Sequence, residues 1–141
     1  MLKNRVRVTG VCLAVVLTVA MSMAAKEKEL EKPSMQFDHV GMVTTEKKPN
    51  EMYVAATKVW VTDFKSHPYR VEWLRFEPDS PVTGPVRTGT HIAYSVDSIE
   101  KAAKGLKVLL EPFDAGIARV GFYQTDDGVM VEFMEYPKES K

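Results

Sequence analysis

The chain has 141 residues, of which 45% are hydrophobic and 27% are charged, a composition that fits one globular domain. Lysine and arginine together number 19, aspartate and glutamate also number 19, and the formal net charge is therefore zero. Because the chain has neither a basic excess nor a long acidic run, we expect no nucleic-acid partner and no acidic solvating tail.

The first 25 residues have the pattern of a secretory signal peptide. Three basic residues within the first seven positions precede an apolar run over 11–23, which is followed by Ala24 and Ala25. The run is shorter than the ~20 residues that span a bilayer, so we expect a cleaved signal over 1–25 and no membrane attachment afterwards. The predicted location is the periplasm or the outside of the cell, and a charged lead-in follows over 26–36.

The single cysteine, Cys12, lies inside this signal segment. The mature protein would then contain no cysteine. This excludes a disulfide scaffold and a thiol nucleophile.

The predicted elements of the first half are mostly short strands. A turn is expected at 47–50 and a short helix from Asn50 to about Thr57, with one strand short or missing compared with the second half. The three predicted strands cover 37–43, 59–63 and 69–76. A segment with three prolines and two glycines follows over 78–89 and predicts a linker between two halves.

The second half predicts a β-α-β-β-β order. After a strand over 91–96, Asp97 is the expected helix cap with Glu100 as its reciprocal partner, and Gly105 is the expected stop. One helical face carries apolar residues at positions 99, 102, 103 and 106. The rest of this half predicts, in order, a strand over 107–110, a loop over 111–116, and strands over 118–124 and 129–136 joined by a hairpin turn at 125–128.

Two pairs of segments repeat in the same order along the chain. A strand with a histidine near its start, His39 or His91, precedes a strand that reads Val, Glu, aromatic, aliphatic, charged, aromatic around Glu72 or Glu132. The histidine and glutamate lie 33 residues apart in the first pair and 41 apart in the second. This predicts one domain over 37–137, with module 1 at about 37–80 and module 2 at about 89–137.

The repeated histidines and glutamates share strand faces with apolar residues. Because strand side chains alternate, each polar group would face the core, where an unpaired charge is costly. One divalent ion bound by all four would remove that cost, and Zn²⁺, Ni²⁺, Mn²⁺, Co²⁺ and Fe²⁺ all suit imidazole and carboxylate donors. Glu77 is the rival of Glu72, but it would face the other side of a regular strand. His67 is expected in a loop.

These residues resemble the vicinal-oxygen-chelate superfamily, which includes glyoxalase I, extradiol dioxygenases and antibiotic-binding proteins. The likeness is best from Thr90 onward, in Glu111-Pro112-Phe113 and in the run that ends at Glu132. It implies an α+β fold of two βαβββ half-modules that pair into curved mixed sheets around a central cavity, with the first module abbreviated. It also implies a divalent metal whose four ligands are His39, Glu72, His91 and Glu132.

The resemblance implies a metal-dependent lyase or isomerase of the glyoxalase type. The metal would stabilise an enediolate of a small oxygenated substrate, and Glu132 or Glu72 would move the proton. If Glu72 is not a ligand, the remaining two histidines and one glutamate suit an Fe²⁺ ring-cleaving dioxygenase. A module that only binds a small molecule is the non-catalytic alternative. A homodimer is a possible assembly.

Overall fold

The computed structural model describes residues 34–138, and within them eight strands and three short helices follow one another. The strands are β1 (Met35–Val43), β2 (Met52–Val54), β3 (Val59–Val61), β4 (Val71–Phe76), β5 (His91–Val96), β6 (Lys107–Asp114), β7 (Arg119–Gln124) and β8 (Met130–Glu135). The helices are η1 (Phe64–Ser66), α2 (Pro85–Thr88) and α3 (Ile99–Ala102). No helix in this part is long and apolar enough to cross a membrane. The predicted signal peptide over 1–25, Cys12, and the lead-in as far as residue 33 lie outside the described residues.

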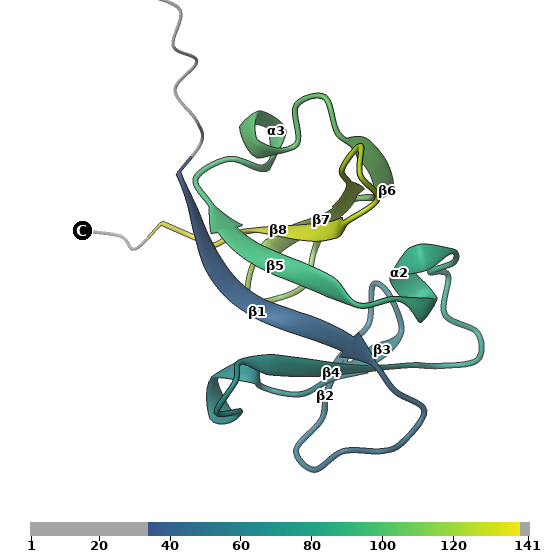
Figure 1. Ribbon diagram of the computed structural model, residues 1–141. Coiled ribbons are helices and arrows are strands. Elements are labelled where there is room, and N and C mark those ends of the chain that lie inside the picture. The colour runs from purple at the N-terminus through teal and green to yellow at the C-terminus, as the bar shows by residue number, and fades with distance from the viewer. Residues whose placement is uncertain (1–33, 139–141) are drawn as a thin grey trace, which may run out of the picture. The chain divides into compact units, whose positions relative to one another are not determined.

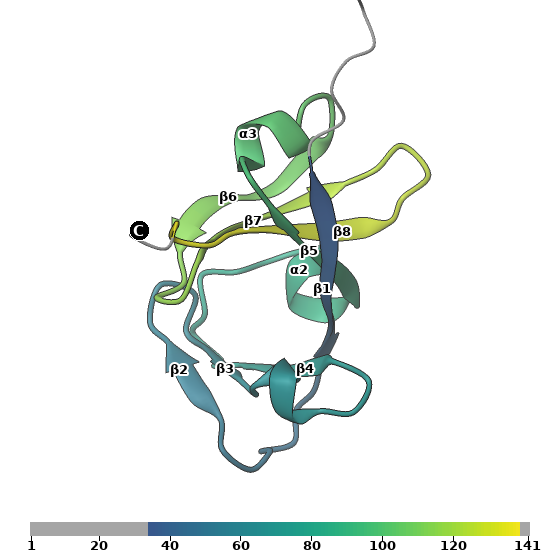
Figure 2. The same cartoon turned by 90° about the vertical axis from the view of Figure 1, so that its left-hand side faces the viewer.

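All eight strands form one mixed sheet in the order β2-β3-β4-β1-β5-β8-β7-β6. The two central strands, β1 and β5, are antiparallel, and each pairs on its other side with a parallel strand, β4 or β8. The remaining pairs are antiparallel. The two halves of the sheet therefore have the same pairing pattern: one parallel pair next to β1 or β5, followed by two antiparallel pairs towards the edge. Figures 1 and 2 show the sheet curled into a half-barrel. The expected curved mixed sheet around a cavity is confirmed, but the described fold is largely β with few helices.

The predicted helix from Asn50 to about Thr57 is wrong. Asn50 has a φ of 57°, which a regular right-handed helix does not accommodate. The β-forming residues after it make strand β2, whose Tyr53 pairs with Trp60 of β3 across a turn that ends at Lys58 with a φ of 48°. The first half therefore has four strands, and the element it lacks is the helix between its first two strands.

Helix α3 begins one residue later than the sequence predicts. Its N-cap is Ser98, not Asp97, and the Ser98 hydroxyl oxygen accepts a hydrogen bond from the Lys101 N–H at 3.4 Å. A carboxylate oxygen of Glu135 accepts from the Ile99 N–H at 3.3 Å, which anchors the first turn to β8. The four apolar residues of the predicted face do pack on the outer side of the sheet, in a cluster with Val131 and Phe133, but the helix ends at Ala102 and does not reach the predicted stop at Gly105.

Strand β6 continues through the predicted loop over 111–116 as far as Asp114. Pro112 is tolerated because β6 is the last strand of the sheet and pairs on one side only, with a register shift between Leu110 and Phe113. The predicted linker contains α2. The hairpin turn is confirmed, because the Gly128 N–H donates to the Thr125 carbonyl at 2.9 Å.

The apolar side chains form clusters on both faces of the sheet. On the outer face, Val96, Tyr123, Val131 and Phe133 pack against α3. On the inner face, one cluster gathers around α2 and another around Ala93. Full burial of one such side chain contributes about 1.5–3 kcal/mol. Strand β8 is buried on both faces from Met130 to Met134, so a polar residue there is removed from water.

Candidate metal site

The four predicted residues lie on the four central strands of the sheet. His39 is on β1, Glu72 on β4, His91 on β5 and Glu132 on β8. The strand register places them in two rows across these strands. In one row, Gly41 of β1 lies opposite both Glu72 and His91, and in the other, Ala93 of β5 lies opposite both His39 and Glu132. In each row, one strand separates the histidine from the glutamate, and the residue of that strand between them is small.

The side chains of these residues converge on one point. The Nε2 atom of His91 lies 3.0 Å from Oε2 of Glu132, and the Nε2 atom of His39 lies 3.4 Å from the same oxygen. Oε2 of Glu72 lies 3.5 Å from His39 Nε2. Ligand atoms of His39, His91 and Glu132 all lie within 4.8 Å of one another. These three buried residues can hold a metal ion, and Glu72 stands beside them.

The converging nitrogen and oxygen atoms of this group are buried without hydrogen-bond partners. His39 is 0% exposed, His91 1% and Glu132 5%. Within the described part of the chain, no hydrogen bond reaches Nε2 of either histidine or Oε2 of Glu132. Leaving a buried polar atom unpaired costs about 1–3 kcal/mol, so three such atoms aimed at one point need an explanation. A divalent ion fits, because imidazole nitrogens and carboxylate oxygens are its usual donors.

Asp38 fixes the orientation of the His39 ring. The Nδ1–H of His39 donates to a carboxylate oxygen of Asp38 at 2.9 Å, and the hydroxyl of Tyr136 donates to the other oxygen at 3.1 Å. Neighbouring residues of a regular strand point to opposite faces, but the pairing of β1 with β5 shifts between Phe37 and His39. With Nδ1 occupied in this way, Nε2 of His39 is the nitrogen left for a ligand.

The two glutamates differ in their electrostatic surroundings. Burial opposes ionisation of Glu132, but His39 and His91 outweigh it and hold the pKa of Glu132 at about 2. Burial is the main cause that raises the pKa of Glu72 above its ordinary value, and the charge of Glu132 adds to it. Burial opposes a charged His39, yet the two nearby carboxylates outweigh it and raise the pKa of His39 to about 10.

A cavity of about 200 Å³ lies against Glu72 and Glu132. Its walls come from both ends of the curled sheet, with Met52 and Val59 on one side and Phe113 and Phe122 on the other. Of the four predicted residues, Glu72 and Glu132 line this space, so a small molecule held there would contact their carboxylates. Figure 2 shows β2 and β6, the two ends of the sheet, on the same side of the half-barrel.

The other acidic and histidine candidates lie elsewhere. A carboxylate oxygen of Glu77 accepts from the Trp60 indole N–H at 2.5 Å and does not approach the group. His67 ends η1 in the predicted loop, where its Nδ1 accepts from the Tyr69 N–H at 3.2 Å. The sequence analysis missed Asp38, although its position directly before His39 was visible.

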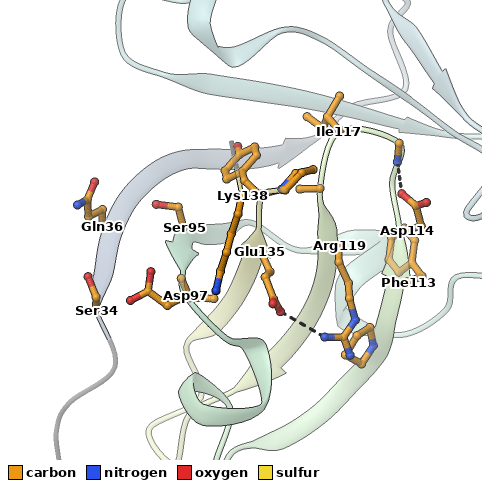
Figure 3. Close-up of a pocket in the computed structure, with 16 residues that line it drawn as sticks. Ser34, Gln36, Ser95, Asp97, Phe113, Asp114, Ile117, Arg119, Glu135 and Lys138 are labelled. Carbon is orange, nitrogen blue, oxygen red and sulfur yellow. Dashed lines mark hydrogen bonds and ion pairs between the residues drawn. The ribbon is translucent and has the colours of Figure 1, made fainter. Parts of the chain in front are cut away.

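A larger hollow of about 910 Å³ contains none of the four predicted residues. Figure 3 shows its polar wall, in which Arg119 and Glu135 are joined by an ion pair of 3.3 Å and face Asp97 and Lys138. This hollow mixes charges of both signs, with Arg119 and Lys138 among its lining residues beside Asp97, Asp114 and Glu135.

Comparison with known proteins finds a similar fold but no related sequence. No family model and no curated protein matches it. One solved structure, of an uncharacterized hypothetical protein from Methanosarcina mazei, is 14% identical to this chain, with a TM-score of 0.50. The match covers 75% of this chain and 98% of that one. At this identity the likeness concerns the fold alone.

Proposed function

We propose that the chain is an exported, metal-dependent lyase or isomerase of the vicinal-oxygen-chelate type. The observation that carries the proposal is the convergence of three buried, unpaired donor atoms, Nε2 of His39, Nε2 of His91 and Oε2 of Glu132, beside a cavity. The matched strand order outward from β1 and β5 supports two half-modules, the first of which has no helix between its first two strands.

The chemistry divides between the ion and the two glutamates. A bound divalent ion would stabilise the negative charge that develops on two neighbouring substrate oxygens when a proton leaves the adjacent carbon. Glu132 contacts both histidines and would help to hold the ion. Glu72 lines the cavity and contacts only His39 among the three, so it is the group placed to accept the proton and return it.

The position of Glu72 also favours a second function. The compact group comprises His39, His91 and Glu132 without Glu72. Two histidines and one carboxylate with open coordination positions are the usual ligands of Fe²⁺ in oxygenases. A ring-cleaving dioxygenase is therefore the alternative, and the identity of the metal separates it from a lyase or isomerase.

The first test is the metal content of the purified protein, measured by elemental mass spectrometry. The wild type is expected to contain about one equivalent of a transition metal, because the described residues contain one group of possible ligands. His39→Ala, His91→Ala and Glu132→Ala are expected to lose it, and Glu77→Ala is the matched control outside the site. A wild type that neither contains nor takes up Zn²⁺, Ni²⁺, Mn²⁺ or Fe²⁺ would contradict the proposal.

The second test follows proton transfer directly. The metal-containing protein is incubated with 3-hydroxy-2-butanone in D₂O, and exchange of the proton on the hydroxyl-bearing carbon is followed by NMR. Exchange in the wild type that is lost in Glu72→Gln, with metal content retained, supports the lyase or isomerase. Bound iron together with dioxygen consumption in the presence of an aromatic diol supports the oxygenase instead.

A further inference from the structure

The cavity beside the candidate metal site has a mostly apolar wall. Among the described residues that line it, the only charged side chains are Glu72 and Glu132. The rest of the wall consists of aliphatic and aromatic side chains, among them Val59, Leu74, Phe113 and Phe122, together with Tyr53 and Thr57. Such a wall contacts hydrocarbon and offers few hydrogen bonds.

The size of the cavity limits its occupant. Its volume is about 200 Å³, and an apolar protein cavity of about 150 Å³ accepts a benzene molecule. A single six-membered ring with one or two substituents therefore fits. A tripeptide adduct, a nucleotide or a thioester of a large carrier would have to leave most of its atoms outside.

The charge of the lining excludes anionic molecules. No lysine or arginine is present among the described lining residues, so a carboxylate or phosphate on the ligand would be buried without a partner. Two ionised glutamates beside one divalent ion would already balance its charge. An additional anion would then lie in a low-polarity space with no charge left to neutralise it.

The wall also disfavours a sugar. Thr57 is 5% exposed, and within the described residues its Oγ1 atom has no hydrogen-bond partner. That hydroxyl can satisfy one polar group of a ligand. A sugar carries a hydroxyl on nearly every carbon, and most of them would lose their hydrogen bonds to water against valine, leucine and phenylalanine side chains.

From these observations we infer that the site binds a small, uncharged, largely hydrocarbon molecule of about one ring, with two neighbouring oxygens at one end. The oxygens would face the glutamates, and the hydrocarbon would fill the space between the two ends of the sheet. This inference rests on the proposed function for the oxygen pair, whereas the apolar and uncharged character of the ligand follows from the cavity alone.

The test compares three matched ligands by titration calorimetry on the metal-containing protein. They are 2-hydroxycyclohexanone, its isomer 4-hydroxycyclohexanone, and 3-hydroxy-4-oxocyclohexane-1-carboxylate, which keeps the oxygen pair and adds a charge at the far end. The uncharged 2-hydroxy compound is expected to bind at least about ten-fold more tightly than the carboxylate, because the charge has no partner. Equal or tighter binding of the carboxylate would overturn the inference.

A variant at the rim of the cavity checks that charge is the cause. Met52 lines the cavity and is 51% exposed, so it can be replaced without disturbing the core. Met52→Lys is expected to improve binding of the carboxylate several-fold, and Met52→Gln, of similar length and no charge, is expected to leave it unchanged. If both variants behave alike, the exclusion of anions does not come from the missing cation and the inference is wrong.

Two further outcomes separate this inference from the proposed function. If the 2-hydroxy and 4-hydroxy isomers bind equally while the carboxylate is rejected, the oxygen pair is not recognised and the proposed function fails. Toluene, which has no oxygen, is expected to bind both the metal-containing and the metal-free protein. If toluene binds neither form, the apolar cavity does not accept a ligand, and the inference fails even where the metal is present.

Discussion

Gly41 leaves the space that the ring of His91 occupies. A Cβ atom on Gly41 would lie 2.0 Å from Cε1 and 2.1 Å from Nε2 of His91, far inside van der Waals contact. The two residues are direct partners on the antiparallel strands β1 and β5. The His91 ring therefore extends over the backbone of β1, and its Nε2 lies 3.0 Å from Oε2 of Glu132.

Gly41→Ala is expected to displace the His91 ring and destabilise the fold. Since the ring is 1% exposed, it has no free space to move into, and overpacking of this kind typically costs about 1–3 kcal/mol. Chemical denaturation would measure the loss, and metal content is expected to fall with it because Nε2 leaves its position.

The same substitution in a His91→Ala background provides the control. Without the imidazole, the added methyl group meets no atom of that ring, so the cost of Gly41→Ala should be much smaller than in the wild type. If the cost is the same in both backgrounds, the clash with His91 is not its cause.

Asp38→Asn is expected to weaken metal binding without removing any donor atom. The Asp38 carboxylate accepts from Nδ1–H of His39, and loss of such a partner typically lowers metal affinity by about 10–100-fold. Competition with a coloured chelator measures the affinity. Tyr136→Phe, which removes only the hydroxyl that donates to Asp38, should produce a smaller change in the same direction. Unchanged affinity in Asp38→Asn would contradict the positioning role.

The ion pair between Glu100 and Arg119 predicts a dependence of stability on pH. Arg119 lies 2.6 Å from Glu100 and lowers the pKa of that carboxyl to about 2 from its ordinary 4.5. Because the pKa is lower in the folded state, the contribution is fully present above about pH 4.5 and is lost as the pH falls toward about 2. Both groups are exposed, so the effect is small.

The urea midpoint of Glu100→Gln should therefore lie slightly below that of the wild type near neutral pH, and the gap should close by about pH 2. Arg119→Gln should remove the same contribution. The double variant should be little less stable than either single variant, because each single change already removes the pair. The Arg119 variants also lose the separate contact of Arg119 with Glu135. A gap that is independent of pH would mean that the pair does not cause it.

The sequence predicts the strands well where β-forming residues are bounded by clear turns. The strand of His91 and the hairpin that ends at Gly128 are found as predicted. The segment after Asn50 was misassigned because it is short and its partner, β3, is also short, so the choice between helix and hairpin depends on pairing with β4. Single-segment patterns do not contain that information.

The grouping of the polar residues could be predicted because the pattern occurs twice. His39 and Glu72 hold the same positions in the first repeat as His91 and Glu132 hold in the second, which implies equivalent strands. In each half, the histidine strand pairs directly with the glutamate strand. The role of Asp38 could not be predicted, since it depends on a local shift in the pairing of β1. The role of Gly41 had a visible signal, because a small residue follows each histidine at the second position.

Addition of metal is expected to stabilise the folded chain, and the two glutamates are expected to differ in how much of that stabilisation they support. A ligand at 100 times its dissociation constant adds about 2.7 kcal/mol, which would raise the Tm by roughly 10 °C in a domain of this size. Oε2 of Glu132 contacts Nε2 of both histidines, whereas Glu72 contacts that of His39 alone. Glu132→Gln should therefore abolish the rise in Tm, and Glu72→Gln should retain most of it.

Differential scanning calorimetry of each variant, with metal and after treatment with a chelator, makes this comparison. The chelator should return the wild type to the Tm of the metal-free chain, and Glu77→Gln should behave as the wild type because Glu77 bonds to Trp60 away from the site. Equal loss in Glu72→Gln and Glu132→Gln would show that Glu72 is a full ligand, so the site would use four protein donors and the proton-transfer role would need another group.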